Sequence, residues 1–454
     1  MSLSIVILAA GKGTRMKSAK PKVMHTLAGK PLLQHVIDTA KTLNPSELVV
    51  VCGNGAEIVV PHVEQQGFKT VMQHEQKGTG HAVEQAKDFF KSSDQVLVLY
   101  GDVPLTHQST LEALINEGDK DTLKVLTTEL DDPTGYGRIV RDDEGNMQCI
   151  TEQKDADEYT KLINEVNSGI MCIPAQWLNE TISLLDDNNA QGEYYLTDLI
   201  AKAVSQGRVI DSVVCDDEME VAGVNNRLQL SELESHYQQM KATELMLSGV
   251  TLVDPARIDI RGELSTGQDI HVDINVIFEG SNTIADNVEI GPNCIIINST
   301  IAEGAVILAN SIIEDAEVGS ECTVGPYARL RPGTKLSAKA KVGNFVEIKN
   351  ANIGLGSKIN HLSYIGDTDM GADVNIGAGT ITCNYDGANK HRTVIGDRVF
   401  VGSDTQLVAP VTLEDGATIG AGSTIRKTAV VDALTLTMSQ QKTVKGWQRP
   451  TKKK

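Results

Sequence analysis

Residue types that bind phosphate gather near the N-terminus. The segment Leu8-Ala9-Ala10-Gly11-Lys12-Gly13-Thr14-Arg15-Met16 directly follows an apolar run, and Lys22 comes shortly after it. Small residues let a backbone approach a ligand, and consecutive N–H groups can surround phosphate oxygens. The spacing is not that of a Walker A loop, and Met16 stands where a dinucleotide fingerprint has its third glycine. The segment predicts a phosphate site with Arg15 and Lys22 as its cations, with a plain glycine-rich turn as the alternative.

Asp102 is the second candidate, because it ends an apolar run that is typical of a buried strand, Leu97-Val98-Leu99-Tyr100-Gly101-Asp102. In open α/β sheets, ligands bind outside the carboxyl ends of the strands. A carboxylate placed there beside a triphosphate is a natural Mg²⁺ ligand. The alternative role is that of a turn or helix cap.

His361 is the third candidate, and it lies between Ile359 and Ile365 of a repeated pattern. Histidine changes protonation near neutral pH, which suits a general base. A lone histidine on such a repeat can also be purely structural. Polar and charged residues in or beside the same repeats nevertheless indicate a binding face: Arg331, Lys349, Tyr364, Asn375, Asn384, Tyr385 and Lys390.

The second half of the chain must position His361, and its aliphatic residues recur every six positions. One run comprises Val318, Val324, Leu330, Leu336, Val342 and Ile348, and a second comprises Ile395, Val401, Leu407, Leu413, Ile419 and Ile425. A period of six fits neither a helix nor an alternating strand. It predicts a solenoid of short strands that begins near Thr251. Such a solenoid is a flat-sided prism, and each face must either be covered by other residues or serve as a binding surface. The pattern breaks between Gly377 and Val394, where the polar segment 384–390 predicts an extruded loop.

The first ~225 residues alternate strand and helix patterns, which predicts an α/β domain with a mostly parallel sheet. The expected strands are Leu3–Leu8, Glu47–Cys52, Gln95–Tyr100 and Leu123–Thr128, and helical patterns include Leu32–Leu43 and Gly80–Phe90. A long helix is expected over about Arg227–Leu247, with Gly249 as its C-terminal cap. The predicted domains are residues 1–226, a linker helix at 227–249, and the solenoid with its tail at 250–454.

Composition excludes several classes of protein. The formal net charge is -19 and only the last residues form a basic run, so nucleic-acid binding is not expected. No apolar run approaches the length of a membrane span, and the N-terminus has no basic region typical of a signal peptide, which predicts a cytoplasmic protein without a membrane span. The seven cysteines form no CxxC pair, so we expect reduced thiols.

The segment Leu8-Ala9-Ala10-Gly11-x-Gly13-Thr14-Arg15-Met16, with Pro21-Lys22, resembles the signature of sugar-phosphate nucleotidyltransferases. Together with the repeats, nearly the whole chain resembles the bacterial family of bifunctional N-acetylglucosamine-1-phosphate uridyltransferases / glucosamine-1-phosphate acetyltransferases. The blocks 135–138, 188–195 and 343–347 carry this resemblance. It implies a Rossmann-like nucleotidyltransferase domain, a linker helix and a left-handed parallel β-helix of hexapeptide repeats.

The resemblance implies that UTP and acetyl-CoA are cosubstrates, that Mg²⁺ is required, and that the sites make UDP-N-acetylglucosamine. Implied nucleotide contacts are Leu8, Ala9, Gly11, Gln73, Gly78 and Thr79, with Arg15 and Lys22 on the phosphates. Implied sugar contacts are Gly137, Glu152 and Asn167, with Tyr100 lining the pocket, and the implied Mg²⁺ ligands are Asp102 and Asn225.

For acetyl transfer, the resemblance implies His361 as the general base and a homotrimer that shares each site between subunits. Implied acceptor contacts are Arg331, Lys349, Lys390, Tyr364 and Asn375, and implied acetyl-CoA contacts are Ala378, Asn384, Tyr385, Ser403 and Ala421. One departure is visible, because Met438 stands near the position where the family usually has a basic residue for coenzyme A. Lys427 or a tail residue could supply that charge.

Two other functions fit parts of the pattern. The chain could be a nucleotidyltransferase whose solenoid only oligomerises, against which His361 and its neighbouring cations weigh. It could also be a regulatory assembly subunit with both sites decayed, against which intact Arg15, Lys22 and Asp102 weigh.

Overall fold

A computed structural model describes residues 2–452 of the chain. The chain divides into two compact units, Met1–Tyr237 and Gln238–Lys454, and the division falls within one long helix. None of the helices in the described part of the chain is long and apolar enough to cross a membrane.

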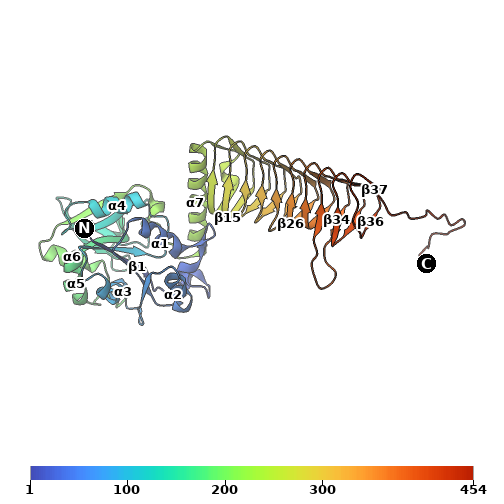
Figure 1. Ribbon diagram of the computed structural model, residues 1–454. Coiled ribbons are helices and arrows are strands. Elements are labelled where there is room, and N and C mark those ends of the chain that lie inside the picture. The colour runs from blue at the N-terminus through green and yellow to red at the C-terminus, as the bar shows by residue number, and fades with distance from the viewer. Residues whose placement is uncertain (1, 453–454) are drawn as a thin grey trace. The chain divides into compact units, whose positions relative to one another are not determined.

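The first unit contains a mixed sheet with helices around it (Figure 1). Its strand order is β11-β7-β10-β6-β1-β4-β5. β1 pairs in parallel with β4 and β6, while β10 runs antiparallel to β6 and β7, so the prediction of a mostly parallel sheet is confirmed. The strands are β1 (Leu3–Ala9), β2 (Thr26–Leu27), β3 (Lys30–Pro31), β4 (Glu47–Cys52), β5 (Lys69–Met72), β6 (Gln95–Tyr100), β7 (Leu123–Glu129), β8 (Arg138–Arg141), β9 (Met147–Thr151), β10 (Glu165–Pro174) and β11 (Ile210–Cys215).

Both faces of the central strands are buried, because alternate residues enter two different cores. Ile5 and Ile7 pack in one core, whereas Val6 and Leu8 pack in the other. The covering helices are α1 (Leu32–Thr42), α2 (Ala56–Glu64), α3 (Thr79–Gln85), α4 (Gln108–Asn116), α5 (Ala175–Thr181) and α6 (Asp198–Ser205). The helix expected over Gly80–Phe90 is instead α3 followed by the short 3-10 helix η3 (Lys87–Phe89). This burial on both sides explains the unbroken apolar runs of the sequence.

Helix α7 spans Arg227–Leu247, as predicted. Leu233 is buried in a core of the first unit, while Ala242 and Leu245 are buried in the core of the second. Gly249 follows the helix with φ 102°, a left-handed conformation that favours glycine after a helix end.

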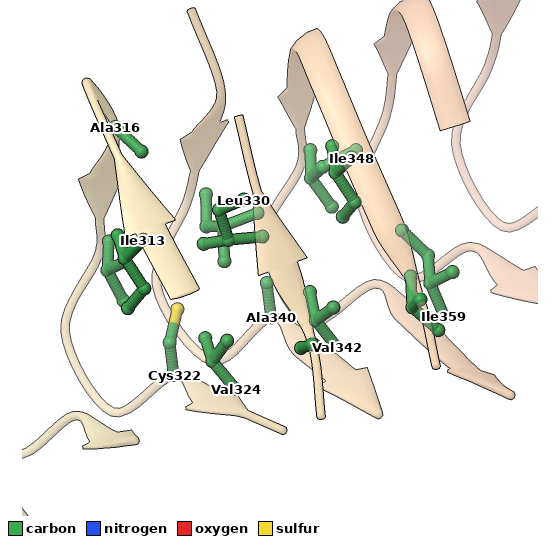
Figure 2. Packing of buried hydrophobic residues seen from close by; sticks show 14 of the residues in the cluster. Ile313, Ala316, Cys322, Val324, Leu330, Ala340, Val342, Ile348 and Ile359 are labelled. Carbon is green, nitrogen blue, oxygen red and sulfur yellow. The ribbon is translucent and has the colours of Figure 1, made fainter. Parts of the chain in front are cut away.

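The second unit is a parallel β-helix in which successive coils stack in register. Val324 pairs with Val342 and Val342 with Ile359, so that these two coils take 18 and 17 residues. Figure 2 shows Ile313, Leu330 and Ile348 in one interior row, with Val324, Val342 and Ile359 in another. All six side chains are at most 1 % exposed. The six-residue period is thereby confirmed as a stack of aliphatic rows.

The strands of this unit form two hydrogen-bonded sheets. One consists of β12 (Val250–Leu252), β14 (Ile270–Val272), β16 (Glu289–Ile290), β19 (Val306–Ile307), β22 (Thr323–Val324), β25 (Lys341–Asn344), β27 (Lys358–His361), β29 (Asn375–Ile376), β32 (Phe400–Val401), β35 (Thr418–Ile419) and β37 (Leu434–Thr435). The other covers the remaining two faces with β13 (Ile258–Thr266), β15 (Val276–Ile284), β17 (Ile295–Ile297), β18 (Thr300–Ile301), β20 (Ile312–Glu314), β21 (Glu317–Val318), β23 (Arg329–Leu330), β24 (Lys335–Leu336), β26 (Glu347–Ile353), β28 (Tyr364–Met370), β30 (Ile381–Cys383), β31 (Thr393–Ile395), β33 (Gln406–Val408), β34 (Val411–Leu413) and β36 (Thr424–Ile425).

The interruption of the coil is shorter than the sequence predicted. Strand β30 pairs with β33 inside the expected gap, and Thr382 occupies the core position of its row at 1 % exposure. A threonine in place of an aliphatic residue hid this strand from the repeat pattern. The extruded loop therefore comprises residues 384–392, and a bridge between Tyr385 and Lys390 closes it (Figure 1).

One corner of the coil carries bulky residues where the backbone is left-handed. Asn293 and Asn310 have φ values of 60° and 61° there, and further along the same corner Tyr327, Phe345 and Leu362 have 56°, 56° and 47°. Asparagine tolerates this conformation well, whereas aromatic and aliphatic side chains are strained in it. These three side chains are also 53 %, 56 % and 63 % exposed. Backbone strain and exposed apolar surface therefore occur together at this corner.

Candidate active sites

A cavity of about 510 Å³ opens at the carboxyl ends of β1 and β6 in the first unit. The expected nucleotide and metal residues that line it are Leu8, Ala9, Gly11, Lys22, Gln73, Gly78, Thr79, Tyr100, Asp102 and Asn225. These come from five separate stretches of sequence, which the parallel sheet brings to one edge. The structure therefore assembles most of the predicted nucleotide site.

Asp102 and Asn225 face a common cation position. The Lys22 ammonium donates a hydrogen bond to Asp102 Oδ2 and another to Asn225 Oδ1, the latter over 3.1 Å. One carboxylate oxygen and one amide oxygen that both reach a single ammonium are also close enough to share one metal ion, and both are the hard oxygen ligands that Mg²⁺ prefers. The donor set fits the predicted metal.

Hydrogen bonds stabilise the part of the cavity wall that contains Gly78 and Thr79. The Tyr194 N–H donates to the Lys77 carbonyl over 2.7 Å, and the Gly80 N–H donates to the Tyr194 carbonyl over 2.8 Å. The Leu196 N–H donates to Thr79 Oγ1 over 3.0 Å. A Cβ atom on Gly78 would come within 2.5 Å of the Tyr194 carbonyl oxygen, so only glycine fits at this position.

The expected sugar contacts form a second cluster. The Asn167 N–H donates to the Gly137 carbonyl over 2.9 Å, and a Cβ on Gly137 would lie 3.5 Å from Glu152 Oε1. Burial raises the pKa of Glu152, and the Thr197 hydroxyl, which donates to Oε1 over 3.2 Å, opposes that rise. Burial also raises the pKa of Tyr100, with the Glu152 charge adding to the effect. Gly137, Glu152 and Asn167 do not line the nucleotide cavity itself.

Arg15 is not brought into the cavity, because it lies on the exposed 3-10 helix η1 (Thr14–Met16). Six further residues line the cavity that the sequence did not indicate as contacts: Ala10, Lys12, Val23, Gln76, Ala82 and Glu193. Lys12 lies within the glycine-rich loop, so its charge and position could have indicated it.

In the second unit, His361 is exposed at a corner of the coil and is oriented by Asn344. Its Nδ1 lies 3.0 Å from Asn344 Oδ1. An amide oxygen only accepts, so Nδ1 carries the proton and donates it, which leaves Nε2 with a free lone pair. Asn344 belongs to a block that carries the family resemblance, but its link to His361 becomes visible only when the coils are stacked.

His361 is one member of a straight row. The aliphatic residues Ile359, Ile376, Val401 and Ile419 occupy equivalent positions in successive coils, as does Val342 one coil earlier. The residues two positions after these five are Asn344, His361, Ala378, Ser403 and Ala421. The expected base and three of the expected acetyl-CoA contacts therefore lie along one corner of the coil.

Two cations of the adjacent face and one of the extruded loop lie close together. Arg331 and Lys349 directly follow Leu330 and Ile348, which are paired in register, and Arg331 donates to Glu347 Oε1 over 2.7 Å. The neighbouring Lys390 ammonium is the main cause that lowers the pKa of Lys349, and desolvation and Arg331 act in the same direction. Glu347 offsets only part of this local positive charge, and cations held this close form a site for a multiply charged anion.

Asn384 is held beside these cations by a buried carboxylate. Asp367 is 6 % exposed, and its two oxygens accept from the side-chain amides of Asn350 and Asn384. The amide nitrogen of Asn384 is thereby turned toward Asp367, which leaves its oxygen to accept from a ligand. A Cβ on Gly366 would approach both the Tyr364 hydroxyl and the Asn384 amide, so these two expected contacts are neighbours.

The remaining expected contacts lie further apart. Asn375 begins β29 and pairs with Lys358 and Phe400, on the face beyond the His361 corner. Tyr385 is 61 % exposed on the extruded loop. Met438 is 91 % exposed in the tail, where it offers no charge to a coenzyme.

Family models match three parts of the chain. Residues 5–154 match the MobA-like NTP transferase domain, residues 260–358 the GMPPB C-terminal domain, and residues 392–427 the bacterial transferase hexapeptide in six repeats. These matches agree with the α/β sheet of the first unit and the coil of the second.

Full-length relatives carry the name bifunctional protein GlmU. The protein from Marinobacter nauticus is 54 % identical over 450 residues, which cover 99 % of both chains. That from Stutzerimonas stutzeri is 55 % identical over 453 residues, and one from Pseudomonas putida is 54 % identical over 454 residues, each covering the whole of both chains. Since this identity extends through both units, the chain belongs to the family of bifunctional GlmU proteins.

Proposed function

We propose that the two units catalyse consecutive reactions that make UDP-N-acetylglucosamine. The second unit transfers the acetyl group of acetyl-CoA to glucosamine 1-phosphate. The first unit then joins the product to the UMP part of UTP and releases pyrophosphate. The observation that carries this proposal is His361, oriented by Asn344 beside three cations, on the same chain as a cavity built for a nucleotide.

In the acetyl transfer, His361 Nε2 accepts a proton from the amino group of glucosamine as the nitrogen attacks the thioester carbonyl. The bond between nitrogen and the acetyl carbon forms, the carbon–sulfur bond breaks, and the imidazolium of His361 returns its proton to the sulfur, so that coenzyme A leaves as the thiol. Asn344 stabilises the imidazolium by accepting from Nδ1, while Arg331, Lys349 and Lys390 hold the sugar phosphate. The Ala378 N–H and Ser403, in the same row as His361, face the developing oxyanion.

In the uridylyl transfer, a phosphate oxygen of N-acetylglucosamine 1-phosphate attacks the α-phosphorus of UTP in line, and pyrophosphate leaves from the opposite side. No side-chain nucleophile is required. Arg15 and Lys22 neutralise the phosphates, while Gly137, Glu152 and Asn167 orient the sugar beside Tyr100. Arg15 must approach the cavity from its exposed position for this role.

Asp102 and Asn225 would hold Mg²⁺, which supplies charge neutralisation at the transferring and leaving phosphates when bound. Their oxygens already converge on the Lys22 ammonium. Lys22 therefore has to turn away from at least one of these oxygens when a metal ion is held there. The flexible four-carbon stem of lysine allows its ammonium to move to a phosphate instead.

The bulky corner of the coil supports a homotrimer. Tyr327 and Phe345 stack with ring centroids 5.3 Å apart, and Leu362 continues their line while all three remain largely exposed. Exposed apolar groups in a strained backbone are typical of a surface that a partner covers. A second copy of the chain is the partner that the family resemblance implies, and closed symmetry would place the same corner of every copy at the interface.

Two assays on the purified full chain test the proposal. Release of coenzyme A from acetyl-CoA and glucosamine 1-phosphate reports the second unit, and release of pyrophosphate from UTP and N-acetylglucosamine 1-phosphate reports the first. We expect His361→Ala to lower acetyl transfer at least ~100-fold, the usual contribution of a general base, and to spare uridylyl transfer. Asp102→Ala should do the reverse, because the two variants lie in separate units.

Unchanged acetyl transfer by His361→Ala would mean that His361 is not the general base, and absence of acetyl transfer by the wild-type chain would mean that the coil only oligomerises. Absence of pyrophosphate release by the wild-type chain, with UTP and Mg²⁺ present, would instead support the assembly subunit with decayed sites.

A further inference from the structure

Gln73 has a side-chain amide whose orientation is determined by two acceptors. The side chain is 3 % exposed at the wall of the nucleotide cavity. Its Nε2 lies 3.0 Å from the Gly78 carbonyl oxygen and 3.0 Å from His81 Nδ1. Because a carbonyl oxygen only accepts, the amide nitrogen must face this side, and both of its hydrogens are used. The amide oxygen of Gln73 is left to accept a hydrogen bond from whatever occupies the cavity.

His81 is thereby assigned a single tautomer. The amide nitrogen can only donate, so His81 Nδ1 must accept and the ring is neutral with its proton on Nε2. His81 does not line the cavity, so it can act on a ligand only through Gln73.

The frame that holds both acceptors is rigid. Residues 77–80 are tied to residues 194–196 by the hydrogen bonds described above, and Gly78 has φ 109° with no room for a Cβ atom. His81 lies in α3, whose first two residues, Thr79 and Gly80, belong to the tied segment, and its ring lies 6.4 Å from that of Tyr194. If the Gln73 amide rotated, neither the Gly78 carbonyl oxygen nor His81 Nδ1 could easily move with it.

We propose that His81 is a positioning residue that selects uracil over cytosine by keeping the carbonyl oxygen of Gln73 toward the base. This inference rests on the proposed uridylyl transfer. Uracil presents an N3–H donor, which the oxygen of Gln73 accepts, whereas cytosine presents a lone pair at N3, which the same oxygen repels. A buried polar group that is left without its partner discriminates strongly between such analogues.

The test compares UTP with CTP in the pyrophosphate assay, with wild type and variants of the full chain. We expect His81→Leu to lower the ratio of kcat/KM for UTP to that for CTP about tenfold, mainly through a higher KM for UTP, because one donor of Gln73 loses its acceptor. His81→Asn, whose Oδ1 can take the place of Nδ1, should recover most of that ratio. His81→Lys, which offers only donors, should move the ratio further toward CTP even if His81→Leu folds poorly.

The exposed neighbour His74 supplies the matched control, since His74→Leu should leave the ratio unchanged. Circular dichroism verifies that the first unit of each variant is folded, and retained acetyl transfer verifies that the second unit is unaffected. Equal losses with UTP and CTP in His81→Leu and His81→Lys would overturn the inference, because they would mean that His81 only supports α3. A wild-type chain that uses CTP as well as UTP would overturn the uridylyl assignment as well, so the two failures are distinguishable.

Discussion

At the scale of single residues, chemistry is decided by neighbours that are distant in sequence. His361 could be selected from the sequence because an imidazole stood among cations in a regular repeat. Asn344, which determines the protonated nitrogen of His361, lies 17 residues away and is one coil below it. The sequence period predicts that these positions stack, but it does not indicate which polar side chains bond across the coils.

Removing the hydrogen-bond acceptor at position 344 should slow acetyl transfer without preventing substrate binding. We expect Asn344→Leu to lower kcat for acetyl transfer about tenfold or more, because the hydrogen-bond partner of a functional histidine fixes its tautomer and orientation. KM for glucosamine 1-phosphate should change little, since the three cations remain. Asn344→Asp keeps an acceptor and should retain most of the rate; a loss in KM alone would show that Asn344 contacts the substrate instead.

The same limit applies to the nucleotide site. Lys22 and Asp102 could be predicted from a glycine-rich loop and from a strand that ends in a carboxylate, because both signals are local. The bonds between Lys22, Asp102 and Asn225, and those between Gln73 and His81, depend on tertiary packing. Arg15 shows the opposite case, because its motif is strong while the structure leaves its side chain outside the cavity.

At the scale of elements, burial on both faces made the strands predictable. β4 and β6 have the predicted bounds, since five of the six residues in each strand are buried. The hairpin of β8 and β9 was not predicted, because both strands are short and their buried residues follow no regular alternation. Its contact with β10 joins Arg138 to Val166, which are distant in sequence. In the coil, Thr382 shows that one polar core residue is enough to conceal a strand.

The adjacent isoleucines of β20 test the contribution of the aliphatic rows. Ile313 is fully buried in the interior, whereas Ile312 faces outward on the same strand with intermediate exposure. We expect Ile313→Ala to lower the free energy of unfolding of the second unit by about 2–5 kcal/mol, because the interior row cannot close the cavity. Ile312→Ala should cost about 1 kcal/mol or less. Urea unfolding followed by circular dichroism measures both, and equal losses would contradict the interior row as the main source of stability.

At the scale of the whole molecule, the two units carry separate chemistry on one chain. Their strand patterns are so different that the sequence distinguishes them at once, one by alternating strands and helices and the other by its period of six. The pattern of one chain does not reveal how the faces of the coil are covered, because in the proposed trimer the covering residues would come from another copy of the chain. The exposed corner at Tyr327, Phe345 and Leu362 becomes visible only through the geometry.

That corner provides a test of self-association. Tyr327→Asn with Phe345→Asn replaces the stacked rings by the residue that Asn293 and Asn310 already place at the same corner, so the coil itself should remain folded or become more stable. The trimer should dissociate at concentrations where the wild type is intact, and acetyl transfer should fall with it. Sedimentation velocity gives the oligomeric state; an unchanged trimer would place the interface elsewhere.

The register of the coil also restricts how the length of such a chain can change during evolution. Removing one complete turn between Ile290 and Ile307 would shorten the prism by about 4.8 Å and leave equivalent strands facing each other. Losing a single residue inside a strand would instead rotate every later aliphatic side chain from the axis to the solvent. Residues 384–392 illustrate the third route, an insertion at a corner after which Thr393 resumes pairing with Thr368. Homologous coils should therefore differ in length by whole turns or by corner insertions, and hardly ever by single residues within a rung.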